Sequence, residues 1–238
     1  MDAGSIHNRR EFFRMSDTHQ VIFLFDVDNT LLDNDRMKSD LGAYVRETFG
    51  SNAEAQLWAL YEEERIKHGY ADFLGTLEKF RLAHLNDPNI LRFANWVMDY
   101  PYIERLYPDA LGVVRHVSQW GLPVILTDGD GVFQPHKLEQ AGLTKAFGGH
   151  VLNYVHKEKE LGAVERAYPA KHYVLVDDKL KVLDAVKRIW GAGVTTVFPR
   201  QGHYANDAKN LTDLTPADIE IARIADLMEH DFSNVVPA

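Results

Sequence analysis

The sequence predicts an α/β protein with a doubly wound parallel sheet and an inserted all-helical segment. Short, continuous apolar runs end in polar clusters, as in buried parallel strands that are covered on both faces. In the second half of the chain these runs alternate with helical patterns, which is typical of a parallel sheet. Residues 36–100 contain no convincing strand pattern, so we expect them to form the helical insertion.

The first expected strand is the apolar run Val21–Phe25, which leads into Asp26-Val27-Asp28-Asn29-Thr30. Similar apolar runs follow much later in the chain and end at Thr127, Asp177 and Pro199. These later strands are expected at residues 123–126, 173–176 and 194–198, with a weaker candidate at 150–155.

The expected helices of the insertion are separated by glycine and proline. One helix ends at Gly50, and a Ser51-Asn52-Ala53-Glu54 capping box opens a second that ends near Gly69. A third covers residues 72–84, and a fourth runs from Asp87-Pro88 to the residue before Pro101. In the second half, Asp109 is expected to cap a helix that ends at Gly121. Further helices are expected at 133–142, 157–168 and 179–190.

Composition excludes several functions. Lysine and arginine total 26 against 35 acidic residues, a net charge of −9, so we expect no nucleic-acid partner and no membrane association. The 238 residues include no cysteine, which excludes disulfides, thiol nucleophiles and cysteine-bound metals. This composition is compatible with a cytoplasmic monomer or homodimer, which is our expectation.

The N-terminal residues are expected to form a flexible extension. Residues after Arg9-Arg10 are polar, so the segment lacks the apolar core of an export signal. We therefore divide the chain into an extension (1–18), an α/β core (19–33 and 106–238) and a helical insertion (34–105).

Polar side chains follow the expected strands. Asp26 and Asp28 come after the first strand, Thr127 ends the second, and Asp177 and Asp178 end a later one. Ligands of doubly wound sheets bind at this carboxyl edge. Four carboxylates gathered there would repel one another unless a cation joins them, and an all-oxygen site suits Mg²⁺.

The residue types fit phosphoryl chemistry. Asp26 and Asp28 are two residues apart, so both can flank one substrate if the chain stays extended. One can attack phosphorus and form an aspartyl-phosphate, while the other protonates the leaving group. Thr127 offers a hydroxyl and a backbone N–H to phosphate oxygens, and Lys157 can stabilise developing charge. Mg²⁺ would offset the repulsion between nucleophile and substrate.

Four motifs resemble those of the haloacid dehalogenase (HAD) superfamily of hydrolases. Residues 26–31 resemble its first motif, which is the most specific signal. Thr127, Lys157 and Val176-Asp177-Asp178 resemble the second, third and fourth, in the family's order and spacing. The resemblance covers residues 20–200 and implies a Rossmann-like core with the first strand central. It also implies a type I helical cap that closes over the site and selects substrates.

By resemblance, Asp26 is the nucleophile and a metal ligand. Asp28 is the general acid and base, and it binds the metal through its carbonyl. Asp178 binds the metal directly, and Asp177 binds it directly or through water. Thr127 and Lys157 hold the phosphoryl group.

Two positions depart from the family's motifs. Asp128 stands where the family often has asparagine. We include Asp128 among the expected phosphate-binding residues and leave open whether it contacts phosphate. Val182 stands four residues after Asp178, where the family often has an acid, so metal binding rests on the adjacent pair Asp177-Asp178.

The expected function is Mg²⁺-dependent hydrolysis of a small phosphorylated metabolite through an aspartyl-phosphate. A dehalogenase or a phosphonate-cleaving enzyme of the same fold remains an alternative. Those chemistries do not need a leaving-group acid, so Asp28 favours phosphate esters. A catalytically silent phosphate-binding or partner-binding module is the third alternative.

Overall fold

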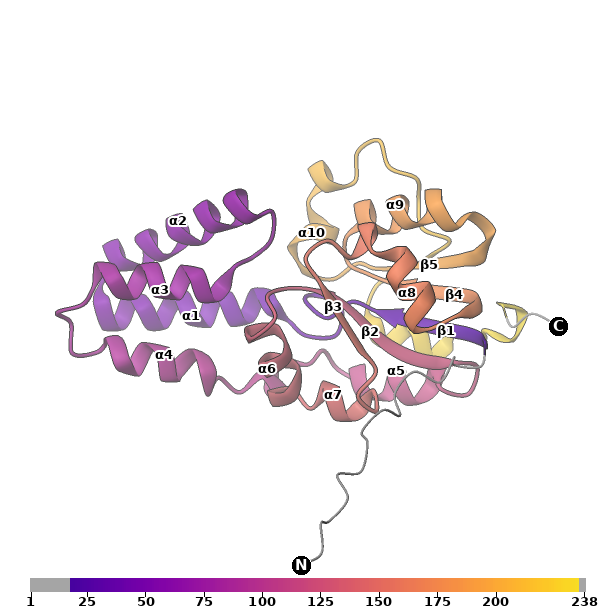
Figure 1. Cartoon of the computed structure of the whole chain (residues 1–238), viewed down its shortest axis with the longest axis horizontal. Coiled ribbons are helices and arrows are strands. Elements are labelled where there is room, and N and C mark those ends of the chain that lie inside the picture. The colour runs from indigo at the N-terminus through magenta and orange to yellow at the C-terminus, as the bar shows by residue number, and fades with distance from the viewer. Residues whose placement is uncertain (1–17, 236–238) are drawn as a thin grey trace, which may run out of the picture.

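A six-stranded parallel sheet forms the centre of the computed structural model, which describes residues 18–235. The strand order is β3-β2-β1-β4-β5-β6, so β1 lies between β2 and β4 as predicted (Figure 1). This arrangement confirms the predicted doubly wound fold. The strands are β1 (His19–Phe25), β2 (Leu122–Asp128), β3 (Val151–Tyr154), β4 (Ala170–Val176), β5 (Val194–Pro199) and β6 (Ile219–Ile221).

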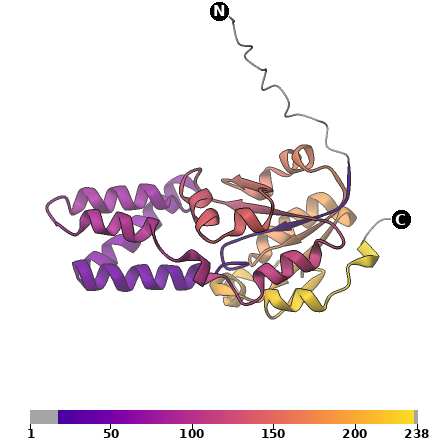
Figure 2. The same ribbon diagram turned by 90° about the horizontal axis from the view of Figure 1, so that it is seen from below.

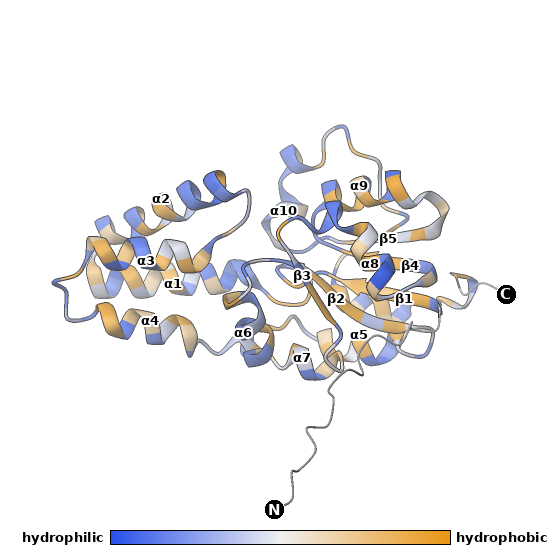
Figure 3. Ribbon diagram, viewed as in Figure 1, coloured by the Kyte–Doolittle hydropathy of each residue, from blue (hydrophilic) through white to orange (hydrophobic). Residues whose placement is uncertain are grey.

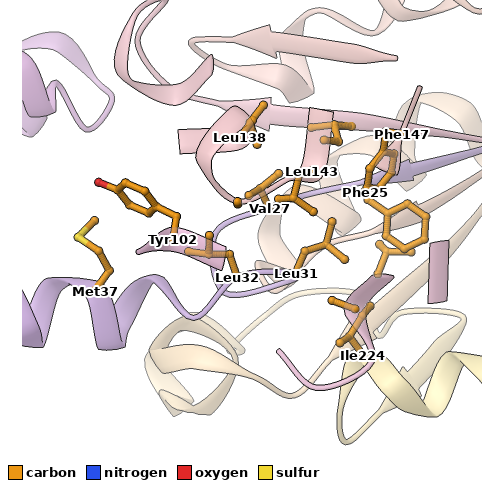
Figure 4. Packing of buried hydrophobic residues seen from close by; sticks show 14 of the residues in the cluster. Phe25, Val27, Leu31, Leu32, Met37, Tyr102, Leu138, Leu143, Phe147 and Ile224 are labelled. Atoms are coloured by element: carbon orange, nitrogen blue, oxygen red, sulfur yellow. The ribbon is translucent and has the colours of Figure 1, made fainter. Parts of the chain in front are cut away.

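Helices cover both faces of the sheet. Alternate residues of β1 belong to two separate cores: Phe23 and Phe25 to one, Ile22 and Leu24 to the other. The first core includes residues of α5 (Ala110–Val117), α6 (Phe133–Gln140) and α7 (Leu143–Ala146), and Figure 4 shows its packing around Phe25. The second includes residues of α8 (Leu161–Ala167) and α9 (Leu180–Trp190). The strands are accordingly apolar along most of their length, whereas the helices carry mixed faces (Figure 3).

The insertion after β1 is helical, as predicted. Its helices lie beyond the carboxyl ends of the strands and beside the layered core (Figures 1 and 2). They are α1 (Asn34–Phe49), α2 (Ser51–His68), α3 (Phe73–Ala83) and α4 (Ile90–Met98), followed by the 3₁₀ turn η1 (Tyr102–Arg105). We call residues 34–105 the helical segment. Its aromatic core includes Phe80 and Phe93, whose rings lie 5.0 Å apart.

Some local predictions were wrong. Gly50, with φ 93°, is the residue before α2 and has no side chain to cap the helix, so the expected capping box does not form. Asp109 precedes α5 but makes no side-chain cap bond; its backbone is left-handed, with φ 61°. The expected helix 157–168 is divided into the 3₁₀ turn η2 (Lys157–Lys159) and α8.

The remaining elements follow β5. Strand β6 was not predicted from the sequence, because three residues are too short a run to show a strand pattern. The other short elements are η3 (Gly191–Gly193), α10 (Gly202–Asn206), η4 (Ala208–Asn210), η5 (Ile224–Glu229) and η6 (Ser233–Val235).

The expected N-terminal extension, residues 1–18, lies outside the described residues except for Thr18. Within residues 18–235, no helix has the length and apolar character that crossing a membrane requires.

Candidate active site

Asp26 directly follows the central strand β1 at the carboxyl edge of the sheet. Its backbone N–H still donates to Val176 O at 2.9 Å, so Asp26 is fixed by the β1–β4 ladder. The chain then forms a tight turn in which the backbone N–H groups of residues 30–32 donate to Val27 O. Asn29 in this turn has a left-handed backbone with φ 64°, which asparagine tolerates better than most residues. The Asp26 side chain is buried, with 2% of its surface exposed.

Lys157 neutralises two of the buried acids. Its Nζ contacts Asp26 Oδ1 and lies 2.7 Å from Asp177 Oδ2. Burial opposes the charge on Lys157, but Asp177 and Asp26 outweigh that effect and raise its pKa. Burial also raises the pKa of Asp26, and Lys157 counteracts the shift. The predicted third-motif lysine and the first-motif aspartate therefore lie in direct contact.

Asp178 has no such partner. It is fully buried, and neither side-chain oxygen accepts a hydrogen bond from any described residue. Burial, followed by repulsion from Asp26 and Asp177, raises the pKa of Asp178 well above its ordinary value. An isolated charge in this position is costly unless a cation compensates it.

These acids meet the requirements of a hard-cation site. One oxygen each from Asp26, Asp177 and Asp178 lies within 4.8 Å of the others. Asp26 Oδ2 is also buried and without a hydrogen-bond donor among the described residues. Asp177, in contrast, is already engaged, because Oδ1 accepts from Lys179 N at 2.8 Å and Oδ2 faces Lys157. Buried oxygens without a hydrogen-bond donor among the described residues belong to Asp26, Asp177 and Asp178, and Asp177 Oδ2 also forms an ion pair with Lys157 Nζ at 2.7 Å.

Asp28 is not part of this cluster and has a partner of its own, Lys137. Both of its oxygens accept from Lys137 Nζ, at 2.5 and 2.8 Å, and about a quarter of its side chain (27%) is exposed. Lys137 lies on α6 and is itself buried. Lys137 was not identified from the sequence, since a lysine within a helix is usually a solvent-exposed residue.

The second-motif residues occupy the end of β2. Thr127 is buried, and its hydroxyl accepts from Gln134 Nε2 at 2.9 Å. Asp128 Oδ1 accepts from the backbone N–H of Lys157 at 2.8 Å. The Asp128 carboxylate thus holds the backbone of Lys157, and its contact with phosphate stays a prediction. Gln134, also on α6, was not identified from the sequence.

Loop contacts fix the first and fourth motifs relative to each other. Asp178 N donates to Thr30 Oγ1 at 3.0 Å, which connects the two strand ends. Gln201 Nε2 donates to Thr30 O at 3.0 Å. Gly202, with φ 67°, packs against Asn29 so closely that an added Cβ would lie 2.5 Å from the Asn29 Cβ.

The helical segment touches the core near these residues. Phe73 of α3 stacks on Phe133 of α6, with ring centroids 4.8 Å apart and an interplanar angle of 18°. His136 Nε2 lies 2.8 Å from Met98 O at the end of α4. Gly69, after α2, leaves so little space that an added Cβ would lie 3.1 Å from His156 Nε2. The segment therefore contacts the core at α6 and at the loop after β3.

The fold and the site define a hydrolase class with a strand-end aspartate beside a lysine and an acidic pair. Residues 21–191 match the family model for haloacid dehalogenase-like hydrolases. The chain therefore belongs to the haloacid dehalogenase-like hydrolase family. No curated protein matches the chain.

Solved structures agree with this assignment. A haloacid dehalogenase-like hydrolase of Burkholderia xenovorans LB400 is 48% identical, with a TM-score of 0.85 over 92% of this chain and 100% of that one. Two more distant structures share the fold. L-2-haloacid dehalogenase of Xanthobacter autotrophicus is 18% identical, with a TM-score of 0.57 over 87% of this chain and 96% of that one. YfnB of Bacillus subtilis, a HAD-hydrolase, is 17% identical, with a TM-score of 0.59 over the same shares, 87% and 96%.

Proposed function

We propose that the protein hydrolyses phosphate monoesters of small metabolites in the presence of Mg²⁺, through an aspartyl-phosphate on Asp26. The observation that carries this proposal is the second carboxylate, Asp28, two residues after the buried nucleophile. A phosphate ester with an alkoxide leaving group needs a proton donor, whereas displacement of halide does not. Asp28 is partly exposed, so a substrate can reach it.

Magnesium would be held by Asp26, the Asp28 carbonyl and Asp178. The unpartnered oxygens of Asp26 and Asp178 support this assignment, because hard cations prefer such ligands. When bound, the ion supplies positive charge that offsets repulsion between the carboxylates and a phosphate dianion. Asp177 would hold Lys157 and would bind the ion directly or through water.

In the first step, an oxygen of Asp26 attacks phosphorus and the bond from phosphorus to the alkoxide breaks. Asp28 gives its proton to the departing alkoxide. Because Asp28 is paired with Lys137 in the structure, proton donation requires that Asp28 leave this pair. In the second step, Asp28 takes a proton from water, whose oxygen attacks phosphorus and releases Asp26 and inorganic phosphate.

The phosphoryl group would be bound by Lys157 and Thr127. Lys157 already contacts Asp26, so its ammonium lies where charge develops during attack. Thr127 would exchange its contact with Gln134 for one with a phosphate oxygen. We assign Asp128 to positioning Lys157, since a carboxylate in contact with phosphate would be repulsive.

The helical segment would act as a cap that opens for substrate and closes for reaction. The stacked contact between Phe73 and Phe133 would belong to the closed state, in which the cap excludes water. The structure of YfnB bound to magnesium is described as revealing interdomain movement, which supports a hinged cap. We place the hinges near residues 33–36 and 101–108.

Dehalogenation is the second candidate. Its support comes from structural neighbours that are L-2-haloacid dehalogenases, one of them with chloropropionic acid covalently bound. A carboxylate nucleophile such as Asp26 suits displacement at carbon as well as at phosphorus. The two candidates differ in their need for Asp28.

The deciding experiment compares Asp26→Asn and Asp28→Asn on alkyl phosphates, p-nitrophenyl phosphate and 2-haloacids. Asp26→Asn should abolish turnover and the acyl-phosphate adduct. Asp28→Asn should slow alkyl phosphates by about 10²–10⁴ and p-nitrophenyl phosphate less, because p-nitrophenolate departs without a proton. Halide release from 2-haloacids, with no phosphatase activity in Mg²⁺, would establish the dehalogenase instead.

A further inference from the structure

A second group of side chains of the metal-binding types lies in the helical segment rather than at the sheet edge. One oxygen each of Glu64 and Asp72 and one ring nitrogen of His68 lie within 4.8 Å of one another. Glu64 and His68 are four residues apart on α2, so their side chains lie on the same face of that helix. Asp72 is the residue before α3 and therefore brings a third possible ligand from the next helix.

The two carboxylates of this group converge beside Gly75. Asp72 Oδ1 caps α3 by accepting from Gly75 N at 2.8 Å, which leaves Oδ2 for another partner. A Cβ added to Gly75 would lie 2.4 Å from Asp72 Oδ2 and 3.0 Å from Glu64 Oε2. His68 Nε2 lies 3.3 Å from the same Glu64 oxygen. The glycine thus keeps the space beside both oxygens free of a side chain of its own.

The spacing of these atoms fits a tetrahedral metal. Zinc lies roughly 2.0–2.2 Å from nitrogen and carboxylate ligands, so two ligands at a tetrahedral angle are roughly 3.4 Å apart. The distance of 3.3 Å between His68 Nε2 and Glu64 Oε2 agrees with this value. An imidazole ligand favours Zn²⁺ and similar transition ions, whereas Mg²⁺ prefers oxygen ligands. The donor set therefore differs from the all-oxygen group at the sheet edge.

The charges around Glu64 also favour a cation. Only 4% of the Glu64 side chain is exposed. Its Oε1 accepts no hydrogen bond among the described residues, although Lys79 Nζ lies 2.5 Å away. Lys79 is shared with Glu63, whose Oε1 lies 2.6 Å from the same ammonium. One lysine thus faces two glutamates, and Asp72 adds a third carboxylate. A buried carboxylate in such a surplus of negative charge is costly unless a further cation compensates it.

We propose that Glu64, His68 and Asp72 bind a Zn²⁺ ion at the junction of α2 and α3. Three protein ligands leave the fourth position of a tetrahedral ion to water. The ion would connect the end of α2 to the start of α3 and hold the turn between them. This proposal does not depend on phosphatase activity.

The turn between α2 and α3 is a part of the helical segment that meets the core (Figure 1). Gly69 packs against His156, and Phe73 stacks on Phe133 of α6. An ion that holds this turn would therefore stabilise the contact between the helical segment and the core.

Titration calorimetry of the full-length protein with Zn²⁺, in excess Mg²⁺, tests the proposal. Excess Mg²⁺ competes for the catalytic acids, and Asp178→Asn removes one of them, so Zn²⁺ binding that persists in this variant belongs elsewhere. Wild type and Asp178→Asn should both bind Zn²⁺ with similar affinity. At about ten times the dissociation constant, Zn²⁺ should raise the melting temperature of both by roughly 3–6 °C.

His68→Gln and Asp72→Asn should each weaken Zn²⁺ binding by at least about 10-fold and remove the thermal shift, since each lacks one ligand. Asp72→Asn keeps the cap on α3, because asparagine caps helices as well as aspartate does. The matched control is Glu63→Gln, which removes a charge beside Lys79 without removing a ligand. This control should bind Zn²⁺ like wild type.

Loss of Zn²⁺ binding in Asp178→Asn would place the ion at the catalytic acids and overturn the proposal. Unchanged affinity in His68→Gln and Asp72→Asn, or no Zn²⁺ binding by wild type, would also overturn it, and Lys79 would then be the only cation that balances Glu64. None of these measurements requires turnover, so their outcome is separate from that of the proposed function.

Discussion

Replacing Asp178 with asparagine should stabilise the metal-free protein. Asp178 is fully buried, and its oxygens have no hydrogen-bond donor among the described residues. Burial, together with Asp26 and Asp177, raises its pKa well above the ordinary value, which means that the charged form is disfavoured in the fold. Asp178→Asn removes the charge and keeps the shape of the side chain.

The magnitude follows from the charge, because an asparagine at this position is unpaired as well. A buried group without a partner costs about 1–3 kcal/mol and a charged one more, so we expect a gain of about 1–3 kcal/mol. For a chain of this length, each kcal/mol corresponds to roughly 2–4 °C in melting temperature. A carboxyl whose pKa is raised on folding reduces stability as pH rises above its ordinary value of 3.8. The advantage of Asp178→Asn should therefore be present at neutral pH and disappear in acid.

Thermal unfolding measured in chelator and in Mg²⁺ tests this reasoning. In chelator, Asp178→Asn should melt above wild type. In Mg²⁺ at about ten times the dissociation constant, wild type should gain about 1.4 kcal/mol, because the ion binds only the folded state. The variant should gain little, since it has lost a ligand.

A lower melting temperature of Asp178→Asn in chelator would refute the claim that the Asp178 charge is uncompensated. An equal Mg²⁺-dependent gain in both proteins would refute its role as a ligand. Both readouts are independent of turnover.

Three further predictions concern other parts of the molecule. Phe73→Ala removes the ring stacked on Phe133, so small-angle X-ray scattering should show a larger radius of gyration; an unchanged curve would exclude the stack as a closing contact. Burial lowers the pKa of His172, so stability should fall as pH drops below 6.5, and His172→Gln should flatten that fall in chemical denaturation at several pH values. Gly202→Ala should cost about 1–3 kcal/mol in urea unfolding, because its left-handed backbone and the contact with Asn29 leave no space for Cβ. A cost below the error of the measurement would show that the loop around Gly202 shifts to accommodate the added Cβ.

The sequence predicted the sheet and its strand ends because both depend on local patterns. Apolar runs that stop at Asp26, Thr127 and Asp177 determine where strands end, and parallel strands end at one edge. The contact between Lys157 and Asp26 followed from that topology and from the motif order. Short elements such as β6 carry too few residues for a pattern to be visible.

Other site residues could not be predicted, because their roles arise from packing between distant segments. Lys137 contacts Asp28 from α6. From its charge alone, a lysine in a helix is expected to be exposed to solvent. Gln134, one turn earlier, meets Thr127 through the same helix placement. Nothing in their sequence neighbourhoods distinguishes them from surface residues.

The central position of β1 has a consequence for synthesis of the chain. β1 ends at Phe25, yet its partners β2 and β4 begin at Leu122 and Ala170. On the ribosome, the apolar segment Val21–Phe25 therefore has no strand partner until the whole helical segment has been translated. Contacts so distant along the chain slow folding and expose a β-prone run to other chains. Helices α1–α4 can form from local contacts during this delay, so Asp26, which follows β1, is among the last groups to reach its final surroundings.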